Sequence, residues 1–93
     1  MSFRLVYEPG ARELLRRLPP DLKQLLKRSI ETLKTDPYAG KDLKLELAGY
    51  RSLRSRRYRV IYRIRAKKRQ VEIHYFGRRT DVYEAFRRLL EGG

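Results

Sequence analysis

The sequence predicts an α+β fold in which a helical hairpin packs on one face of an antiparallel-rich sheet. The first third of the chain carries two apolar stripes at helical spacing, and most of the rest alternates apolar and polar residues with a period of two. Short connections between the alternating segments require antiparallel pairing. A chain of 93 residues has the size of one small domain, which we assign to 1–93. The expected order of elements is β-α-α-β-β-β-α.

The N-terminal part is expected to hold one strand and the helical hairpin. Residues 3–7 alternate in the manner of a strand. Pro9 can start a helix, and Pro19-Pro20 ends it. A second apolar stripe then continues until Asp36-Pro37, because the residue before proline is pushed out of the helical region. Two amphipathic helices with so short a break form an antiparallel hairpin, which needs a sheet to cover its apolar side.

The C-terminal part is expected to supply that sheet. Leucines alternate with charged residues over 43–47 and lead through Gly49 into a strand at 50–54. Two longer strands are predicted at 58–65 and 70–76, separated by a turn at 66–69. We expect Gly77 to break the strand pattern, and Thr80 to cap a final helix that reaches Leu90.

The composition excludes several classes of protein. The chain has no cysteine, so it has neither disulfides nor thiolate metal sites, and its single histidine argues further against a metal centre. No segment approaches the roughly 20 apolar residues that a membrane span needs, and the N-terminus lacks the apolar run of a signal peptide. We therefore expect a cytoplasmic protein that needs no metal or other cofactor and does not bind membranes.

Half of the cationic residues are concentrated in one stretch. Of 24 Lys and Arg residues, 12 lie between Arg51 and Arg79, where Glu72 is the one acid, so this stretch carries +11 of the total formal charge of +13. The period of two points the following residues toward the helices: Tyr58, Val60, Tyr62, Ile64, Val71, Ile73 and Tyr75. It points these to the opposite, non-helical face: Arg59, Ile61, Arg63, Arg65 and His74. A surface with so few acids to relieve repulsion is predicted to meet a polyanion.

The residue types favour chemistry on phosphate. No Ser-His-Asp grouping, glycine-rich phosphate loop or HExxH motif is present. Arginine donates two parallel hydrogen bonds to phosphate, and clustered cations stabilise the phosphorane that forms when a phosphodiester is cleaved. Cleavage by arginine and tyrosine alone is efficient only if the substrate supplies its own nucleophile, as RNA does through the 2′-OH.

Three segments resemble the conserved blocks of the RelE/ParE toxin superfamily. They are Leu47-Ala48-Gly49-Tyr50-Arg51-Ser52-Leu53-Arg54, Tyr58-Arg59-Val60-Ile61-Tyr62 and Gly77-Arg78-Arg79-Thr80-Asp81-Val82-Tyr83. The element order fits as well, so the resemblance covers nearly the whole chain and implies a RelE-like fold. RelE-type members are toxins of toxin–antitoxin pairs that cleave mRNA in the ribosomal A site.

The resemblance also implies catalytic roles for individual residues. Arg59 matches the arginine that contacts the scissile phosphate and stabilises the transition state, and Arg79 matches one that assists the leaving group. Tyr83 matches the tyrosine that stacks on the substrate base and is proposed as the base for the 2′-OH, although its helical spacing with Phe86 also fits a packing role. The family's strand cations, often lysines, fall on Arg51 or Arg54, and the register between these two is open.

The remaining cations are expected to bind RNA without taking part in chemistry. They are Arg56, Arg57, Arg63, Lys67, Lys68, Arg69 and Arg78. We interpret His74, Glu46 and Glu72 as structural or surface residues. The implied partners are an acidic antitoxin that covers the cationic face, the ribosome with its 16S rRNA, and mRNA.

Two other functions are compatible with the sequence. ParE-type members share the fold, are not nucleases and poison DNA gyrase, but they generally lack the full set of Arg59, Arg79 and Tyr83. A nucleic-acid-binding module without toxicity is the other alternative, because a cationic face alone permits it.

Overall fold

The computed structural model describes residues 2–92. Its helices and strands, with three short 3-10 turns (η), are β1 (Arg4–Tyr7), α1 (Pro9–Arg17), α2 (Pro20–Glu31), η1 (Thr32–Lys34), β2 (Lys41–Asp42), η2 (Leu45–Leu47), β3 (Arg51–Ser55), β4 (Tyr58–Arg65), η3 (Ala66–Lys68), β5 (Gln70–Arg78) and α3 (Val82–Leu90). The predicted α+β class and helical hairpin are confirmed. The short strand β2 was not predicted.

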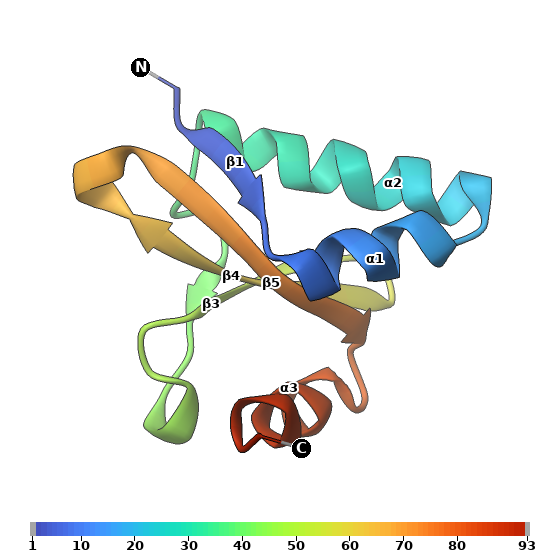
Figure 1. Cartoon of the computed structure of the whole chain (residues 1–93). Helices are drawn as coiled ribbons and strands as arrows, with labels where there is room; N and C mark the ends of the chain where they lie inside the picture. The colour runs from blue at the N-terminus through green and yellow to red at the C-terminus, as the bar shows by residue number, and fades with distance from the viewer. Residues whose placement is uncertain (1, 93) are drawn as a thin grey trace.

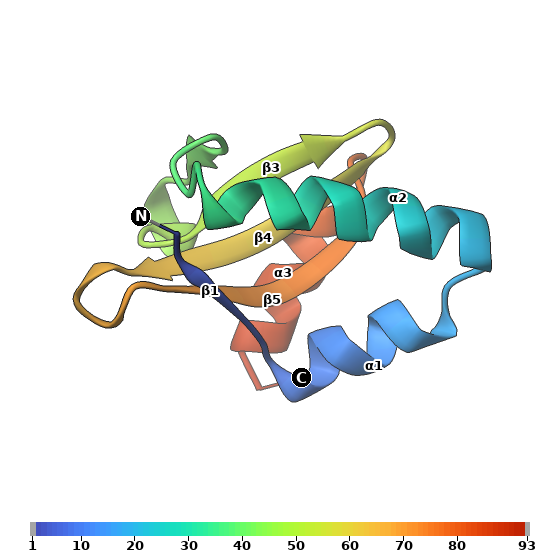
Figure 2. The same cartoon turned by 90° about the horizontal axis from the view of Figure 1, so that it is seen from above.

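The five strands form one sheet in the order β1-β5-β4-β3-β2. β1 runs parallel to β5, whereas the other neighbours are antiparallel. The hairpin α1–α2 lies on one face of this sheet and α3 lies on the other (Figure 1). Seen from above, α2 runs over β3 and β4 (Figure 2). The molecule therefore has three layers.

The main core lies between the sheet and the hairpin. Its buried residues are Ala11, Leu15, Leu26, Ile30, Leu33, Val60, Tyr62, Val71, Ile73 and Phe76. α1 and α2 each have proline in the first turn, where the missing N–H costs no helical hydrogen bond. The apolar stripes that follow both prolines are buried against β4 and β5, as the period of 3.6 predicts.

A second, smaller core lies under α3. Val82 and Phe86 of α3 are buried with Ile61 of β4 and Leu47. The face opposite the hairpin was predicted to be free of helices, and this prediction was wrong. The amphipathic α3 covers part of that face, so only the remainder is left for the cationic side chains.

A β-bulge in β5 changes which residues face the hairpin. Ile61 pairs with Tyr75, but the next residue, Tyr62, pairs with Ile73, so His74 is an extra residue on β5. The prediction that Tyr75 points to the hairpin was therefore wrong, because Tyr75 packs in the core under α3. Phe76 takes the inward position instead.

Two turn predictions also differ from the structure. β5 continues through Gly77 to Arg78, and α3 begins at Val82 with Asp81 as N-cap, so neither the strand break at Gly77 nor the cap at Thr80 is found. The alternating leucines before Gly49 form the turn η2 rather than a strand. Leu45 has a φ of 54° and is 84% exposed, so the alternation of leucines in this segment does not mark the buried face of a strand.

No helix within residues 2–92 has the length and apolar character needed to cross a membrane.

Candidate active site

Two arginines of the predicted site face each other across adjacent strands. Arg54 of β3 lies directly opposite Arg59 of β4, and directly opposite residues of an antiparallel pair project from the same face. Ser52 and Ile61 form the next pair on that face, and Ile61 is covered by α3. Arg54 and Arg59 therefore lie on the face that carries α3, one pair beyond the edge of its core.

Arg79 is held beside this pair by the backbone. Its N–H donates a hydrogen bond of 2.8 Å to the carbonyl of Arg57 in the turn between β3 and β4. A cleft of about 590 Å³ opens at this end of the sheet. Its lining consists of Arg54, Arg56, Arg57, Arg78, Arg79 and Thr80.

The cations at this end have no acidic partners within residues 2–92. None of the five arginines that line the cleft, nor Arg59, forms an ion pair there. Like charges on adjacent strands destabilise a sheet unless something relieves them. A bound polyanion would do so, and the fork of each guanidinium suits a phosphate.

Tyr83 reaches the same face from α3. Its ring packs against the core under α3, and its hydroxyl lies 2.9 Å from the hydroxyl of Ser52. Arg54 follows two positions after Ser52 on the same side of β3, because side chains of a strand alternate. The predicted packing role of Tyr83 is found, and its hydroxyl reaches the sheet face that carries Arg54. Tyr83 does not line the arginine cleft, however, but a separate hollow with Lys41, Asp42, Leu43, Lys44 and Leu47. Sequence reasoning missed Ser52, although its position two residues before Arg54 placed it on that face.

Arg51 lies on the other face of the sheet. It pairs with Tyr62, which belongs to the hairpin core. Its guanidinium donates to Asp42 at 2.6 Å, to the carbonyl of Gly40 at 2.6 Å and to that of Tyr38 at 3.3 Å. The Arg51 side chain is only 17% exposed. It therefore fastens β2 and the preceding loop to β3, on the sheet face opposite to the one that carries Arg54 and Arg59.

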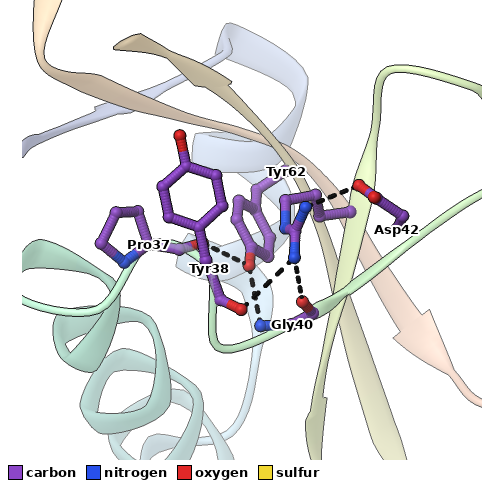
Figure 3. Close-up of polar contacts among 6 residues, drawn as sticks. Pro37, Tyr38, Gly40, Asp42 and Tyr62 are labelled. Carbon is purple, nitrogen blue, oxygen red and sulfur yellow. Dashed lines mark hydrogen bonds and ion pairs between the residues drawn. The ribbon is translucent and has the colours of Figure 1, made fainter.

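The same loop is fixed by a buried tyrosine. The Tyr62 hydroxyl donates to the carbonyl of Pro37 at 2.7 Å and accepts the N–H of Gly40 at 3.0 Å (Figure 3). Burial raises the pKa of Tyr62, although the hydrogen bond from Gly40 and the positive charge of Arg51 act in the opposite direction. A neutral phenol that both donates and accepts suits this position.

The other cations predicted to bind RNA lie at the far end of the sheet. Lys67 and Lys68 belong to η3 and Arg69 follows it, in the connection between β4 and β5. This connection and the end of β5 that leads to α3 lie at opposite ends of the sheet (Figures 1 and 2). Arg63 is partly neutralised, because it lies 3.8 Å from Glu72 and stacks over Tyr50.

Glu8, Glu72 and His74 form a cluster that sequence reasoning did not anticipate. Their potential ligand atoms all lie within 4.8 Å of one another. Glu72 is already engaged, however, by Arg65 at 3.0 Å and by His74 at 3.1 Å. Burial alone would raise the pKa of Glu72, but the hydrogen bonds from His74 and Arg65 outweigh it and lower that pKa. The geometry is that of an ion-pair network between β4, β5 and Glu8.

The comparisons with known proteins agree with this architecture. The family model described as "ParE toxin of type II toxin-antitoxin system, parDE" matches residues 5–83. A chain of the toxin–antitoxin complex RelBE2 from Mycobacterium tuberculosis is 31% identical, with a TM-score of 0.76 over 85% of this chain and 100% of that one. The isolated E. coli RelE toxin is 25% identical, with a TM-score of 0.69 over 95% and 99% of the two chains.

A third structure matches in fold only. The YoeB/ParE toxin from Agrobacterium tumefaciens is 24% identical and has a TM-score of 0.68, over 82% of this chain and 98% of that chain. No curated protein sequence matches the chain.

The fold and its arginine face define a small toxin of type II toxin–antitoxin systems. The chain belongs to the RelE/ParE superfamily, within the family of the ParE toxin model.

Proposed function

We propose that this toxin is a ribosome-dependent endoribonuclease that cleaves mRNA in the A site. One observation carries the proposal: Arg54 and Arg59 oppose each other on the sheet face that the Tyr83 hydroxyl reaches from α3, and Arg79 is fastened to the adjoining turn. A cationic face by itself would support only binding of a polyanion. A tyrosine hydroxyl on the same sheet face as cations that have no acidic partner within residues 2–92 adds the groups that cleavage of RNA requires.

The chemistry is a transfer within the substrate. The 2′-oxygen of a nucleotide attacks the adjacent phosphorus, the bond to the 5′-oxygen breaks, and a 2′,3′-cyclic phosphate remains. Tyr83 orients the 2′-OH or accepts its proton, while Arg54 and Arg59 neutralise the phosphorane. Arg79 donates a hydrogen bond to the departing 5′-oxygen, which takes its proton from water.

Primer extension on mRNA in a translation extract tests the proposal. The wild type should produce defined cuts, and Arg59→Ala or Tyr83→Phe should abolish them, because the first removes a charge from the phosphorane and the second removes the hydroxyl. Circular dichroism of each variant controls for folding. Undiminished cutting by both folded variants would refute this mechanism.

The partners follow from the same charges. We expect an acidic antitoxin to cover the arginine face, since the chain carries a formal charge of +13 and the RelBE2 structure from M. tuberculosis is a toxin–antitoxin complex. The ribosome, through its 16S rRNA, and mRNA are the proposed targets, which places the activity in the cytoplasm.

Inhibition of DNA gyrase is the second candidate, because the matching family model is that of ParE. Purified protein would then stabilise cleavage complexes between gyrase and DNA and leave mRNA intact in the same extract. Cuts in mRNA without such complexes would exclude this function.

A further inference from the structure

We propose that Ser52 is a positioning residue for Tyr83, a role that rests on the proposed ribonuclease function. The hydroxyl of Ser52 holds the phenol oxygen of Tyr83 over β3, on the sheet face that carries Arg54 two positions further along the strand. In this position it keeps a hydrogen bond to Tyr83 whether or not the phenol carries its proton.

Ser52 lies on a rigid base. It is 2% exposed and lies in the middle of the sheet, opposite Lys41 of β2 on one side and opposite Ile61 of β4 on the other. Its backbone is therefore fixed by strands on both sides. A hydroxyl attached to it cannot follow Tyr83 if α3 moves, so it defines a fixed point for the phenol oxygen.

The contact is a specific one. Among residues 2–92 the Tyr83 hydroxyl is the side-chain partner of Ser52, at 2.9 Å. A buried hydroxyl that lacks a hydrogen-bond partner destabilises the folded protein. Alanine at this position would carry no such cost, so the serine is useful here only because its hydroxyl is paired. The apolar contacts of the Tyr83 ring with the core under α3 fix the plane of the ring, whereas the bond to Ser52 fixes its oxygen.

The chemistry of the two hydroxyl groups explains why serine suits this position. A serine hydroxyl has one hydrogen to donate and two lone pairs that accept. It accepts from the neutral phenol, which leaves the phenol lone pairs directed at the 2′-OH. It donates to the oxygen of a phenolate. Alanine can do neither.

Ser55 provides a matched control on the same strand. It is 4% exposed, and its hydroxyl lies 2.7 Å from that of Ser29 on α2. Ser52 and Ser55 are three positions apart, so they face opposite sides of the sheet. Ser55→Ala therefore removes an equally buried hydroxyl–hydroxyl contact that lies away from Tyr83.

The experiment measures cleavage of mRNA on saturating ribosomes together with its dependence on ribosome concentration. Ser52→Ala should lower the maximal rate about 10- to 100-fold, because a small displacement of a catalytic group has effects of this size, and KM should stay within a factor of about two. Ser52→Thr keeps the hydroxyl and should restore most of the rate. Ser55→Ala should cut like the wild type.

Ring-labelled tyrosine NMR provides a readout that does not depend on cleavage. The Tyr83 signal, identified by its loss in Tyr83→Phe, should shift in Ser52→Ala and keep its position in Ser55→Ala. Three results would each overturn the proposal. The first is a Ser52→Ala variant that cuts at the wild-type rate, and the second is a loss of rate in Ser52→Thr as large as in Ser52→Ala. The third is a Tyr83 signal that does not move in Ser52→Ala.

Failure of the proposed function gives a different result. A wild type that leaves mRNA uncut on the ribosome would refute the ribonuclease, and the role of Ser52 in catalysis with it. A wild type that cuts, beside a Ser52→Ala variant that cuts equally well, would refute the role of Ser52 alone.

Discussion

Arg51 and Arg54 lie three positions apart on β3, and this spacing separates their roles. Side chains alternate along a strand, so two residues an odd number of positions apart cannot share a face. Arg54 lies opposite Arg59, whereas Arg51 lies opposite the buried Tyr62. The sequence contained this information once Arg59 was assigned to the cationic face. The partners of Arg51 could not be predicted from the sequence, because they are two backbone carbonyls of an irregular loop and Asp42 of the short strand β2.

At the residue scale we predict opposite phenotypes for the two arginines. Arg51→Ala should lower the free energy of unfolding by about 1–3 kcal/mol, because Asp42 and two carbonyls lose their hydrogen-bond donor. Arg54→Ala should change that free energy by less than about 0.5 kcal/mol, as expected of an exposed residue without a fixed partner, and should slow the cutting of mRNA. Urea unfolding and primer extension on the two variants check both expectations. A folded Arg51→Ala variant of normal stability that fails to cut would return Arg51 to the catalytic group.

At the scale of elements, the regular segments were predictable and the irregular ones were not. Helical and strand periods placed α1, β4 and the starts of α2 and β5 correctly, since each buries one continuous stripe. The second helix was expected to reach Asp36 but ends at Glu31, and the turn η1 continues its apolar stripe with Leu33. The bulge at His74 is invisible to such reasoning, because one extra residue reverses the alternation that follows it. β2 has only two residues and no pattern, and it pairs through backbone groups.

The loop before β2 is the element whose packing tolerates change least. A Cβ atom on Gly40 would come 2.6 Å from the carbonyl oxygen of Ser52 and 2.7 Å from the hydroxyl of Tyr62. Both neighbours are themselves fixed, the first by the sheet and the second by Pro37. Only glycine fits between them.

We therefore predict that Gly40→Ala lowers the free energy of unfolding by about 1–3 kcal/mol, as overpacking does. Gly10→Ala is the matched control, because Gly10 lies within α1 with nothing within 4 Å of the added Cβ atom. It should stabilise the protein by up to about 1 kcal/mol, since alanine is the better helix former. Thermal unfolding of both variants tests the pair, and equal stability of the two would show that the loop yields to the extra methyl group.

At the scale of the whole molecule, the charge is divided between the two ends of the sheet. The cleft lined by Arg54, Arg56, Arg57, Arg78 and Arg79 lies at one end, and Lys67, Lys68 and Arg69 lie at the other (Figure 1). The sequence predicted the total charge and the strands that carry it. It did not predict the division, because the charges are contiguous along the chain and separate only when β4 and β5 pair.

This division predicts how RNA binding depends on salt. Each lost phosphate contact should reduce the slope of log affinity against log salt concentration by about one. Arg57→Ala at the cleft should reduce the slope by about one. The double variant Lys67→Ala/Lys68→Ala should reduce the slope by about two if both ends of the sheet bind RNA. Arg16→Ala is the control, because Arg16 is paired with Glu13 on α1 at 2.9 Å. Fluorescence anisotropy with a single-stranded RNA measures the slopes. If the slope of Arg16→Ala decreases as much as that of Arg57→Ala, only the net charge of the protein governs binding.

The parallel pairing of β1 with β5 also governs how the protein folds. Arg4 lies opposite Gln70, so the first strand of the chain can pair only after the last strand has been made. Contacts so distant in sequence make folding slow. The core against which the hairpin α1–α2 packs likewise lacks Val71, Ile73 and Phe76 until β5 supplies them. A nascent chain that ends before β5 therefore carries Arg54 and Arg59 on strands β3 and β4, whose core with the helices is still incomplete. Most of the arginines are thus synthesised before the sheet that holds Arg54 and Arg59 opposite each other can form completely.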